Sequence, residues 1–321
     1  MKLEDIYFRM RRDIKEIEKE ISMTIATDQK VLHQASHQLF KAGGKRIRPV
    51  FVLLAGHFGN YQFDKLKKVA AALEIIHMAT LVHDDVIDDA DKRRGKLTVK
   101  AQWDNKVAMY TGDYLLAKFL QLITELENPE IHKILSKILV SIVEGEIDQI
   151  KDFNNWEQSL KQYLRRIKRK TAILLAVSTQ LGAIASDAET KVVRYLYQYG
   201  YNVGMAFQII DDVLDYTGTT AQLGKPAGSD LSQGNITLPA LYAVHCSDER
   251  DQLLELIKND QISEKIDQVV ACIKRSDGIE YSKRLAQRYI IKAQEALEKL
   301  PNIKEKETLF EISEFIAKRT Y

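Results

Sequence analysis

Proline, cysteine and linker-like segments are scarce in this sequence. It has five prolines and two cysteines among 321 residues. No Pro-, Gly- or Ser-rich stretch interrupts it, so nothing marks a boundary between domains. Cys246 and Cys272 stand in unrelated contexts, which favours reduced thiols of a cytosolic protein over a disulfide.

Signals for membrane insertion and for export are also missing. The longest uncharged runs, such as residues 171–186, are too short to span a bilayer. The first residues, MKLEDIYFRMRRD, lack the apolar core of a signal peptide. We therefore expect a soluble, cytoplasmic protein without a transmembrane segment.

Two further absences concern partners and fold. The net charge is only +2, so a global basic field for nucleic acid is lacking.

Alternating apolar and polar residues, the mark of half-buried strands, are not evident, whereas apolar residues recur at helical spacing. The sequence predicts one all-α domain over residues 1–321, with ten or more helices. The apolar helices are expected near 50–59, 69–88, 107–124, 131–150, 171–186, 190–216 and 236–246.

One short stretch of the sequence has an unusually high density of aspartates. The stretch LVHDDVIDDADKRRG occupies residues 81–95 and follows an apolar, helix-favouring run at 69–83. Continuing that helix puts Asp84 and Asp88 on one face, with Asp85 about 100° further round, and makes Arg93-Arg94-Gly95 its end. Carboxylates are disfavoured at the C-terminal end of a helix. A divalent cation bound by carboxylate oxygens would offset this cost.

The same pattern recurs further along the chain. FQIIDDVLDYTG, residues 207–218, carries Asp211, Asp212 and Asp215 after another apolar run. One such cluster is often a solvated helix face, but two at the ends of apolar helices favour a metal site. Mg²⁺ usually completes its shell with water and substrate phosphates. The pair of motifs therefore indicates a diphosphate ligand.

Basic segments provide counterparts for such anions. In KAGGKRIRP, residues 41–49, two glycines permit a tight turn and Lys45, Arg46 and Arg48 precede a helix, where an anion is favoured. Residues 165–170 form a second basic set before an apolar helix expected near Thr171. Arg93-Arg94 and Lys225 add two more. Ordinary surface charge, or an RNA-binding patch at 165–170, are the alternatives.

Taken together, these motifs resemble the trans-isoprenyl diphosphate synthases over nearly the whole chain. The matching marks are G-G-K-R-x-R-P at 43–49, H-D-D-x-x-D at 83–88, R-R-G at 93–95, G-D-Y at 112–114, K-T-A at 170–172, F-Q-I-I-D-D-x-L-D at 207–215 and G-K-P-x-G-x-D at 224–230. The resemblance implies an all-α bundle around a central cavity, generally dimeric, with the two aspartate motifs facing each other across its mouth.

The resemblance also implies roles for individual residues. It makes Asp84, Asp88 and Asp211 ligands of Mg²⁺, with three Mg²⁺ ions present when diphosphate is bound. Asp85, Asp212 and Asp215 would be supporting groups. The diphosphate of isopentenyl diphosphate would meet Lys45, Arg48, His77 and Arg94. An allylic diphosphate such as farnesyl diphosphate would meet Arg93, Lys170, Thr171, Gln208 and Lys225. Without the resemblance, His77 would be interpreted as an ordinary core histidine.

The product is expected to grow along the helix that carries the first motif. Ala79 and Thr80, about one turn before Asp84, and Ile76 a turn deeper, would border the growing chain. In short-chain members a bulky aromatic residue near these positions closes the pocket. Because Ala79 is small, the resemblance implies a medium or long polyprenyl diphosphate.

A departure from the family pattern refines the expectation. Asn235 stands where many members carry a lysine, in QGNITLP. This stretch, with others, resembles bacterial heptaprenyl synthases whose large catalytic chain pairs with a dissimilar small subunit and whose product serves menaquinone synthesis. Homomeric octaprenyl or nonaprenyl synthases are the alternative. A terpene cyclase and a non-catalytic subunit fit less well, because both aspartate motifs and the basic set are intact. A metal-dependent phosphohydrolase would need more clustered histidine ligands than this chain has.

Overall fold

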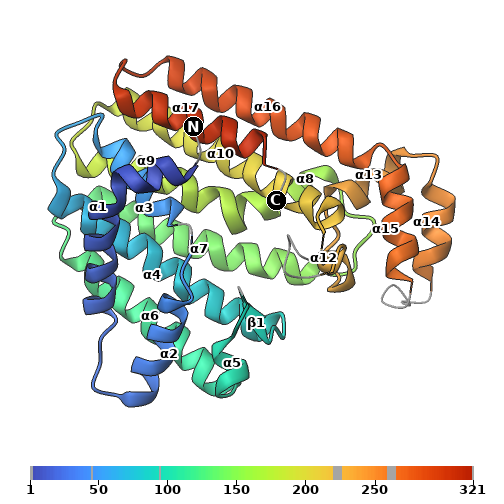
Figure 1. The fold of residues 1–321 in the computed structure, drawn as a ribbon, viewed down its shortest axis with the longest axis horizontal. Coiled ribbons are helices and arrows are strands. Elements are labelled where there is room, and N and C mark those ends of the chain that lie inside the picture. Colours follow the sequence, from blue (N-terminus) through green and yellow to red (C-terminus); the bar gives the residue numbers. More distant parts are fainter. Residues whose placement is uncertain (1–2, 45, 94, 220–225, 259–264, 320–321) are drawn as a thin grey trace. The chain divides into compact units, whose positions relative to one another are not determined.

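The computed structural model describes residues 3–44, 46–93, 95–219, 226–258 and 265–319, and it is mainly helical (Figure 1). The all-α class expected from the sequence is confirmed. The chain forms two compact units, which are described separately. The first unit comprises Met1–Ser136, Val177–Tyr197 and Leu300–Leu309, and the second comprises Lys137–Ala176, Gln198–Lys299 and Phe310–Tyr321.

The first unit is built mainly from the N-terminal helices. Its elements are α1 (Leu3–Thr24), α2 (Lys30–Lys41), α3 (Ile47–Gly56), α4 (Phe63–Ile87), β1 (Lys92–Arg93), β2 (Lys96–Leu97), α5 (Val99–Gln102) and α6 (Asn105–Thr124). Four longer helices contribute residues to both units: α7 (Pro129–Lys151), α9 (Ile173–Ala185), α10 (Thr190–Thr217) and α17 (Lys304–Ala317).

The remaining described elements belong to the second unit. They are α8 (Leu160–Ile167), the π-helical turn η1 (Lys168–Ala172), α12 (Ser229–Ser232), α13 (Leu238–Cys246), α14 (Arg250–Ile257), α15 (Ile266–Arg275) and α16 (Gly278–Glu298). Within this unit, α13 packs against α14, α15 and α16. The observed helices match the expected apolar segments to within a few residues at most ends.

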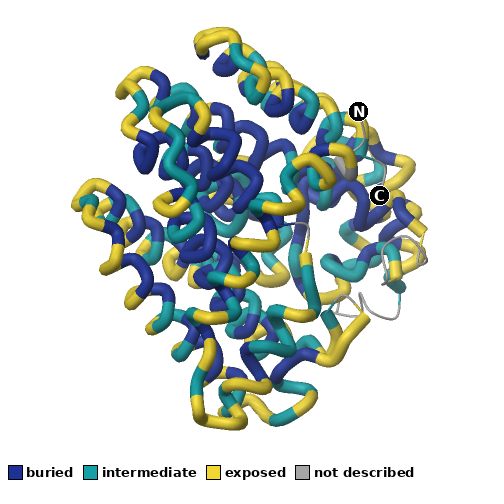
Figure 2. The backbone as a smooth tube through the Cα atoms, turned by 60° about the vertical axis from the view of Figure 1, so that its left-hand side comes forward, coloured by how far each residue is buried: buried dark blue, intermediate teal, exposed yellow. Residues whose placement is uncertain are grey.

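Helix α4 forms the centre of the first unit and packs against α1, α3 and α6. Its middle contains three consecutive alanines, Ala70–Ala72, which are all buried and let neighbouring helices approach closely. Leu73 and Ile75 extend the buried stretch, and Phe51 of α3 is buried as well. Most helices show one buried and one exposed face, seen as alternating dark blue and yellow along the tube in Figure 2.

A buried ion pair fixes the loop before α3 against α4. Arg46 adopts the left-handed conformation, with φ 43°, and its guanidinium donates to the Glu74 carboxylate at 2.8 Å. It also donates to Glu18 at 3.1 Å and to the carbonyl of Phe40 at 3.1 Å. Because burial of an unpaired charge is costly, these contacts explain how Glu74 can lie in an apolar helix.

The expectation that Arg93-Arg94-Gly95 ends the first aspartate helix is wrong. Helix α4 ends at Ile87 with Asp88 as its C-cap, and Asp89 is left-handed, with φ 51°. The chain then forms a short antiparallel hairpin in which Arg93 pairs with Lys96. Gly95, with φ 76°, lies in the turn, a conformation that glycine adopts readily. Gly95 therefore follows the strand β1 rather than a helix.

The apolar helix expected near Thr171 is confirmed, since α9 begins at Ile173, but the helical structure of the basic residues before it was not predicted. The basic residues already lie in α8 and in the π-helical turn η1, which leads into α9. Ser159 and Gln162 form a capping box that starts α8 well before Thr171. At η1, α10 approaches so closely that a Cβ on Gly204 would lie 2.6 Å from the Cα of Ala172. This contact leaves room only for glycine.

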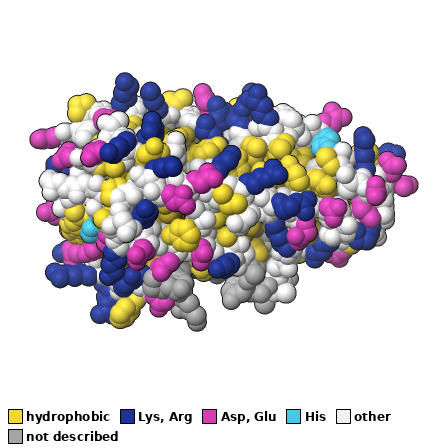
Figure 3. Space-filling view, turned by 90° about the horizontal axis from the view of Figure 1, so that it is seen from above, with side chains coloured by type: hydrophobic (Ala, Val, Ile, Leu, Met, Phe, Trp, Pro, Cys, Tyr) yellow, Lys and Arg dark blue, Asp and Glu magenta, His cyan; other side chains and the backbone are white. Residues whose placement is uncertain are grey.

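The surface agrees with the small net charge. Lys and Arg side chains are interspersed with Asp and Glu on the face drawn in Figure 3. Both cysteines are free thiols. Among the described residues, no helix combines the length and the apolar character that crossing a membrane requires.

Candidate active site

The first aspartate motif lies at the C-terminal end of α4, in the first unit. Asp84 is half-buried and Asp88, the C-cap residue, is exposed. The backbone N–H of Asp88 donates to the carbonyl of Asp84 at 2.8 Å, so the last turn stays regular. Asp85 points elsewhere and is only 2% exposed. The motif thus presents two accessible carboxyl groups and one buried carboxyl group.

Arg93 accounts for the burial of Asp85. Its Nε and Nη2 atoms both lie 2.8 Å from Oδ1 of Asp85. Burial raises the pKa of the Asp85 carboxyl, while the hydrogen bond and charge of Arg93 act in the opposite direction. The hairpin β1–β2 therefore contacts the first aspartate motif through this ion pair. Arg93, expected at an allylic diphosphate, is found on a carboxylate of the first unit.

Two of the expected diphosphate-binding residues, His77 and Arg93, line a small cavity of the first unit. Its lining includes Gly43, Arg46, His77 and Arg93. Arg48 is half-buried at the start of α3. Lys45 and Arg94 lie outside the described residues. Arg46, which the sequence grouped with these cations, is instead committed to Glu74 and Glu18.

The residues expected to border the product lie upstream on α4. Ala79 and Ile76 are buried, with 2% and 4% exposed. Thr80 is half-buried, and its hydroxyl donates to the carbonyl of His77 at 2.8 Å. The side chains at 76 and 79 are thus enclosed in the protein, one to two turns before Asp84.

The second aspartate motif lies near the end of α10, in the second unit. Asp212 is buried and accepts hydrogen bonds from the Tyr163 hydroxyl at 2.6 Å and from the Gln208 amide at 2.8 Å. Burial raises the pKa of Asp212 to about 7, although these two hydrogen bonds lower it. Asp211, one residue earlier, is half-exposed.

The third carboxylate of this motif anchors the loop that follows. Asp215 is 2% exposed, and it accepts from the Ser229 hydroxyl and from the backbone N–H of Asp230, both at 3.2 Å. Its own carbonyl accepts from the N–H of Gly228 at 2.8 Å. Lys225 lies outside the described residues, while Asn235 donates its backbone N–H to the carbonyl of Asp230 at 2.9 Å.

Helix α10 and η1 connect the motif to expected ligands of the allylic diphosphate. The Thr171 hydroxyl donates to Oε1 of Gln208 at 2.6 Å, and Gln208 in turn holds Asp212. Lys170 donates to Gln149 at 2.6 Å and lies 3.7 Å from Glu146, both on α7. π-helical turns are frequent at functional sites. This one brings Lys170 and Thr171 into the same unit as the second motif.

Two residues at the second motif were missed by the sequence interpretation. Tyr163 holds Asp212, and Nη1 of Arg319 lies 3.1 Å from Oδ1 of Asp211. Both are remote from the motif in sequence, and neither has a distinctive local pattern. The basic stretch at 165–170 gave a faint signal for Tyr163, since it begins two residues later.

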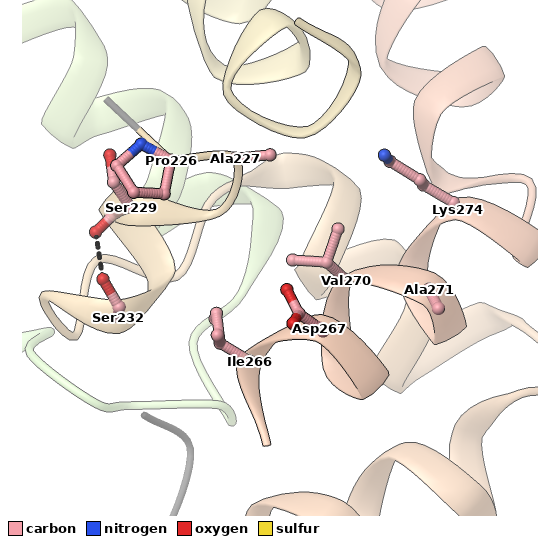
Figure 4. A pocket seen from close by; sticks show the side chains of 9 residues that line it. All are labelled: Pro226, Ala227, Ser229, Ser232, Ile266, Asp267, Val270, Ala271 and Lys274. Atoms are coloured by element: carbon pink, nitrogen blue, oxygen red, sulfur yellow. Dashed lines mark hydrogen bonds between the residues drawn. The ribbon is translucent and has the colours of Figure 1, made fainter. Parts of the chain in front are cut away.

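A separate pocket of about 540 Å³ lies beside the loop that follows the second motif. Figure 4 shows residues of the loop and α12, such as Pro226 and Ser232, on one side and α15 on the other. Its charged members are Asp267 and Lys274. Among the described residues, none of those predicted for the site lines it. Within the described part of the chain, no three His, Cys, Asp or Glu residues are already arranged as metal ligands.

Comparisons with known proteins agree with the motifs. The polyprenyl synthetase family model matches residues 29–274. Heptaprenyl diphosphate synthase component 2 of Bacillus subtilis is 51% identical over all of this chain and 92% of its own length. A heptaprenyl diphosphate synthase structure from Staphylococcus aureus has a TM-score of 0.92 and 41% identity, covering 97% of this chain and 99% of that one.

A third relative carries ligands in its structure. The polyprenyl synthase of Caulobacter crescentus, solved with calcium and isoprenyl diphosphate, has a TM-score of 0.93 and 31% identity, covering all of this chain and 98% of that one. The family model spans well over half of this sequence, and the relatives match along nearly all of it. On these grounds, the chain belongs to the polyprenyl synthetase family.

Proposed function

We propose that this chain is the catalytic subunit of a Mg²⁺-dependent synthase that makes heptaprenyl diphosphate. The observation that carries the proposal is the shared organisation of the two aspartate motifs. In each, the middle carboxylate is buried and held by a neighbouring donor, Arg93 for Asp85 and Tyr163 for Asp212. In each, the first carboxylate is more accessible. This division separates metal ligands from their supports.

The donor set fits a hard divalent cation. Asp84, Asp88 and Asp211 offer carboxylate oxygens, the ligands that Mg²⁺ prefers, and Mg²⁺ is commonly bound by one or two carboxylates together with substrate phosphates. When bound, the metal supplies Lewis-acid stabilisation of charge on a departing diphosphate. The Caulobacter relative was solved with calcium and isoprenyl diphosphate, which supports a divalent ion in this proposal. Three ions are proposed in the presence of diphosphate.

The basic residues divide between two substrates. Arg48 and His77, with Lys45 and Arg94, are proposed to bind isopentenyl diphosphate. Lys170, Thr171 and Gln208, with Arg93 and Lys225, are proposed to bind the allylic diphosphate, such as farnesyl diphosphate. The hydrogen bonds from Thr171 to Gln208 and from Gln208 to Asp212 support the second group, because they join it to an aspartate motif.

The proposed chemistry consists of an ionisation, a condensation and the loss of a proton. The allylic C–O bond breaks and leaves a carbocation and a diphosphate, whose charge the cationic side chains stabilise. The double bond of isopentenyl diphosphate attacks the cation and forms the new C–C bond. Loss of a proton to the departed diphosphate gives the longer allylic product. Apolar walls, including Ile76 and Ala79, would keep water from the cation.

The relatives support the proposed product length and partner. The Bacillus subtilis relative is named as component 2 of a heptaprenyl diphosphate synthase, which supports a heptaprenyl product and a dissimilar small subunit. Menaquinone side-chain synthesis, a cytoplasmic location and a single synthase domain over residues 1–321 are proposed from the sequence. A homomeric octaprenyl or nonaprenyl synthase is the alternative, and a terpene cyclase fits less well.

The test is product analysis with the purified chain. Farnesyl diphosphate and radiolabelled isopentenyl diphosphate are supplied with Mg²⁺, with and without the small subunit of the same host. We expect heptaprenyl diphosphate with the partner and weak turnover without it. Longer products from the lone chain would favour the homomeric alternative. Cyclic hydrocarbon made without isopentenyl diphosphate would point to a cyclase, and no incorporation under any condition would overturn the proposal.

A further inference from the structure

Arg319 lies against the second aspartate motif although it is remote from it in sequence. Helix α17 ends at Ala317, and Arg319 follows two residues later. Its guanidinium lies 5.0 Å above the Phe207 ring and 3.1 Å from the carboxylate of Asp211. Phe207 and Asp211 are one helical turn apart on α10, so both contacts lie on the same helix face.

This contact differs from those of the other two aspartates in the motif. Asp212 and Asp215 are buried and accept hydrogen bonds from uncharged donors, among them Tyr163 and Ser229. The side chain of Asp211 is 47% exposed, and its partner Arg319 is 15% exposed. The proposed metal ligand of the motif is therefore the carboxylate that carries an ion pair with a long, cationic side chain.

In the protein without metal, the ion pair between Arg319 and Asp211 has an electrostatic role. Asp211, Asp212 and Asp215 lie near the C-terminal end of α10, where the helix dipole and mutual repulsion both disfavour negative charge. A guanidinium offsets that repulsion. A divalent cation at the same carboxylate would repel the guanidinium and compete for the same oxygen.

From this geometry we infer that Arg319 is a counter-ion of Asp211 that a divalent metal must displace. The inference rests on the proposed role of Asp211 as a metal ligand. The Phe207 ring can retain the displaced guanidinium nearby through its cation–π contact. Arg319 is thus a positioning residue that sets how much metal the site requires, and it acts through Asp211.

Metal binding measured without turnover tests this directly. Mn²⁺ is titrated in the presence of inorganic diphosphate, and free Mn²⁺ is followed by electron paramagnetic resonance. Arg319→Gln should lower the half-saturating Mn²⁺ concentration by about two- to fivefold, the range for a partly exposed ion pair. Phe207→Leu should shift it in the same direction by less, and Arg319→Lys should stay near wild type.

A neighbouring lysine provides the matched control. Lys318 pairs with Glu314 at 3.2 Å and its side chain is 75% exposed. Lys318→Gln removes the same charge and should leave Mn²⁺ binding unchanged. In an Asp211→Asn background, Arg319→Gln should have no further effect, because its target carboxylate is gone. Circular dichroism checks that every variant remains folded.

The outcomes separate this inference from the proposed function. Unchanged or weaker Mn²⁺ binding by Arg319→Gln would overturn the counter-ion role, and weaker binding would identify Arg319 as a diphosphate ligand. Wild-type Mn²⁺ binding by Asp211→Asn would instead overturn the metal role proposed for Asp211. An equal shift in Lys318→Gln would show a general charge effect and would also reject the inference.

Discussion

The two aspartate motifs share the pattern D-D-x-x-D, yet their third carboxylates have opposite environments. Asp88 is exposed because α4 ends at Ile87 and Asp88 itself caps the helix. Asp215 is buried because α10 continues to Thr217 and Ser229 and Asp230 pack back onto it. The position of the helix end relative to the motif therefore decides which carboxylates remain accessible.

The comparison shows that equal sequence patterns need not have equal environments. The first motif offers two accessible carboxylates, Asp84 and Asp88, whereas the second offers Asp211 alone. The middle residues, Asp85 and Asp212, are alike in burial but unlike in partner: one has an arginine, the other a tyrosine and a glutamine. The ligand set of two plus one, proposed from the family resemblance, agrees with these environments.

The largest expected effect comes from removing the first carboxylate of either motif. Asp84→Asn and Asp211→Asn should each lower kcat by about three orders of magnitude or more, as loss of metal and electrostatic stabilisation predicts. Steady-state incorporation of radiolabelled isopentenyl diphosphate measures the loss. Asp64→Asn, at the exposed start of α4, serves as control and should keep wild-type activity. Near-normal turnover in either motif variant would contradict the metal assignment.

Substitutions at the third aspartate of each motif should affect different properties, activity at Asp88 and stability at Asp215. Asp88→Ala should lower activity strongly while changing the free energy of unfolding by less than about 0.5 kcal/mol, since the side chain is exposed. Asp215→Ala should lower the free energy of unfolding by about 1–3 kcal/mol, because the Ser229 hydroxyl and the Asp230 N–H lose their acceptor. Urea denaturation with parallel assays measures both. Equal destabilisation by the two variants would remove the distinction between the motifs.

The cations near each motif should affect different substrates. Arg48→Ala should raise the KM for isopentenyl diphosphate, and Lys170→Ala should mainly impair use of the allylic diphosphate. Charge-assisted contacts predict losses of about 10- to 100-fold in each case. Each KM is determined with the other substrate saturating. If both variants weaken the same substrate only, the two sites are wrongly assigned.

A smaller effect on rate, but a change of product, is expected upstream of the first motif. Ala79 lies five residues before Asp84, and Ala206 lies five residues before Asp211. Both are buried, so Ala79→Phe and Ala206→Phe should each cost about 1–3 kcal/mol of stability through overpacking. Only Ala79→Phe should shorten the product. Chromatography of the dephosphorylated prenols shows whether length changes; an unchanged pattern in Ala79→Phe would place the growing chain elsewhere.

Much of the architecture could be predicted because helical periodicity and the aspartate motifs are local signals. The apolar helices and the position of Asp84 and Asp88 on one helix end were anticipated. The hairpin after Asp88 was not, since it depends on Asp89 and Gly95 adopting left-handed conformations. The start of α8 depends on a cap at Ser159 that the basic run obscured.

Partners of the motif carboxylates were largely beyond reach of the sequence. Tyr163 and Arg319 contact Asp212 and Asp211 only because tertiary packing brings their helices to α10. Arg46 belongs to a basic motif that suggests a diphosphate ligand, but it instead pairs with the buried Glu74. A charged residue in such a motif can therefore stabilise a buried charge in the core instead of binding substrate. Which of the two it does depends on whether its neighbours are buried charges.

The most direct test is an anomalous-difference map from crystals grown with Mn²⁺ and a non-reactive allylic diphosphate analogue. The proposed ligand set predicts Mn²⁺ peaks about 2.1–2.2 Å from carboxylate oxygens of Asp84, Asp88 and Asp211, close to the distances typical of small hard cations. Asp85 and Asp212 should keep their contacts with Arg93 and Tyr163. Mn²⁺ bound by Asp85 or Asp212, or by neither motif, would contradict it.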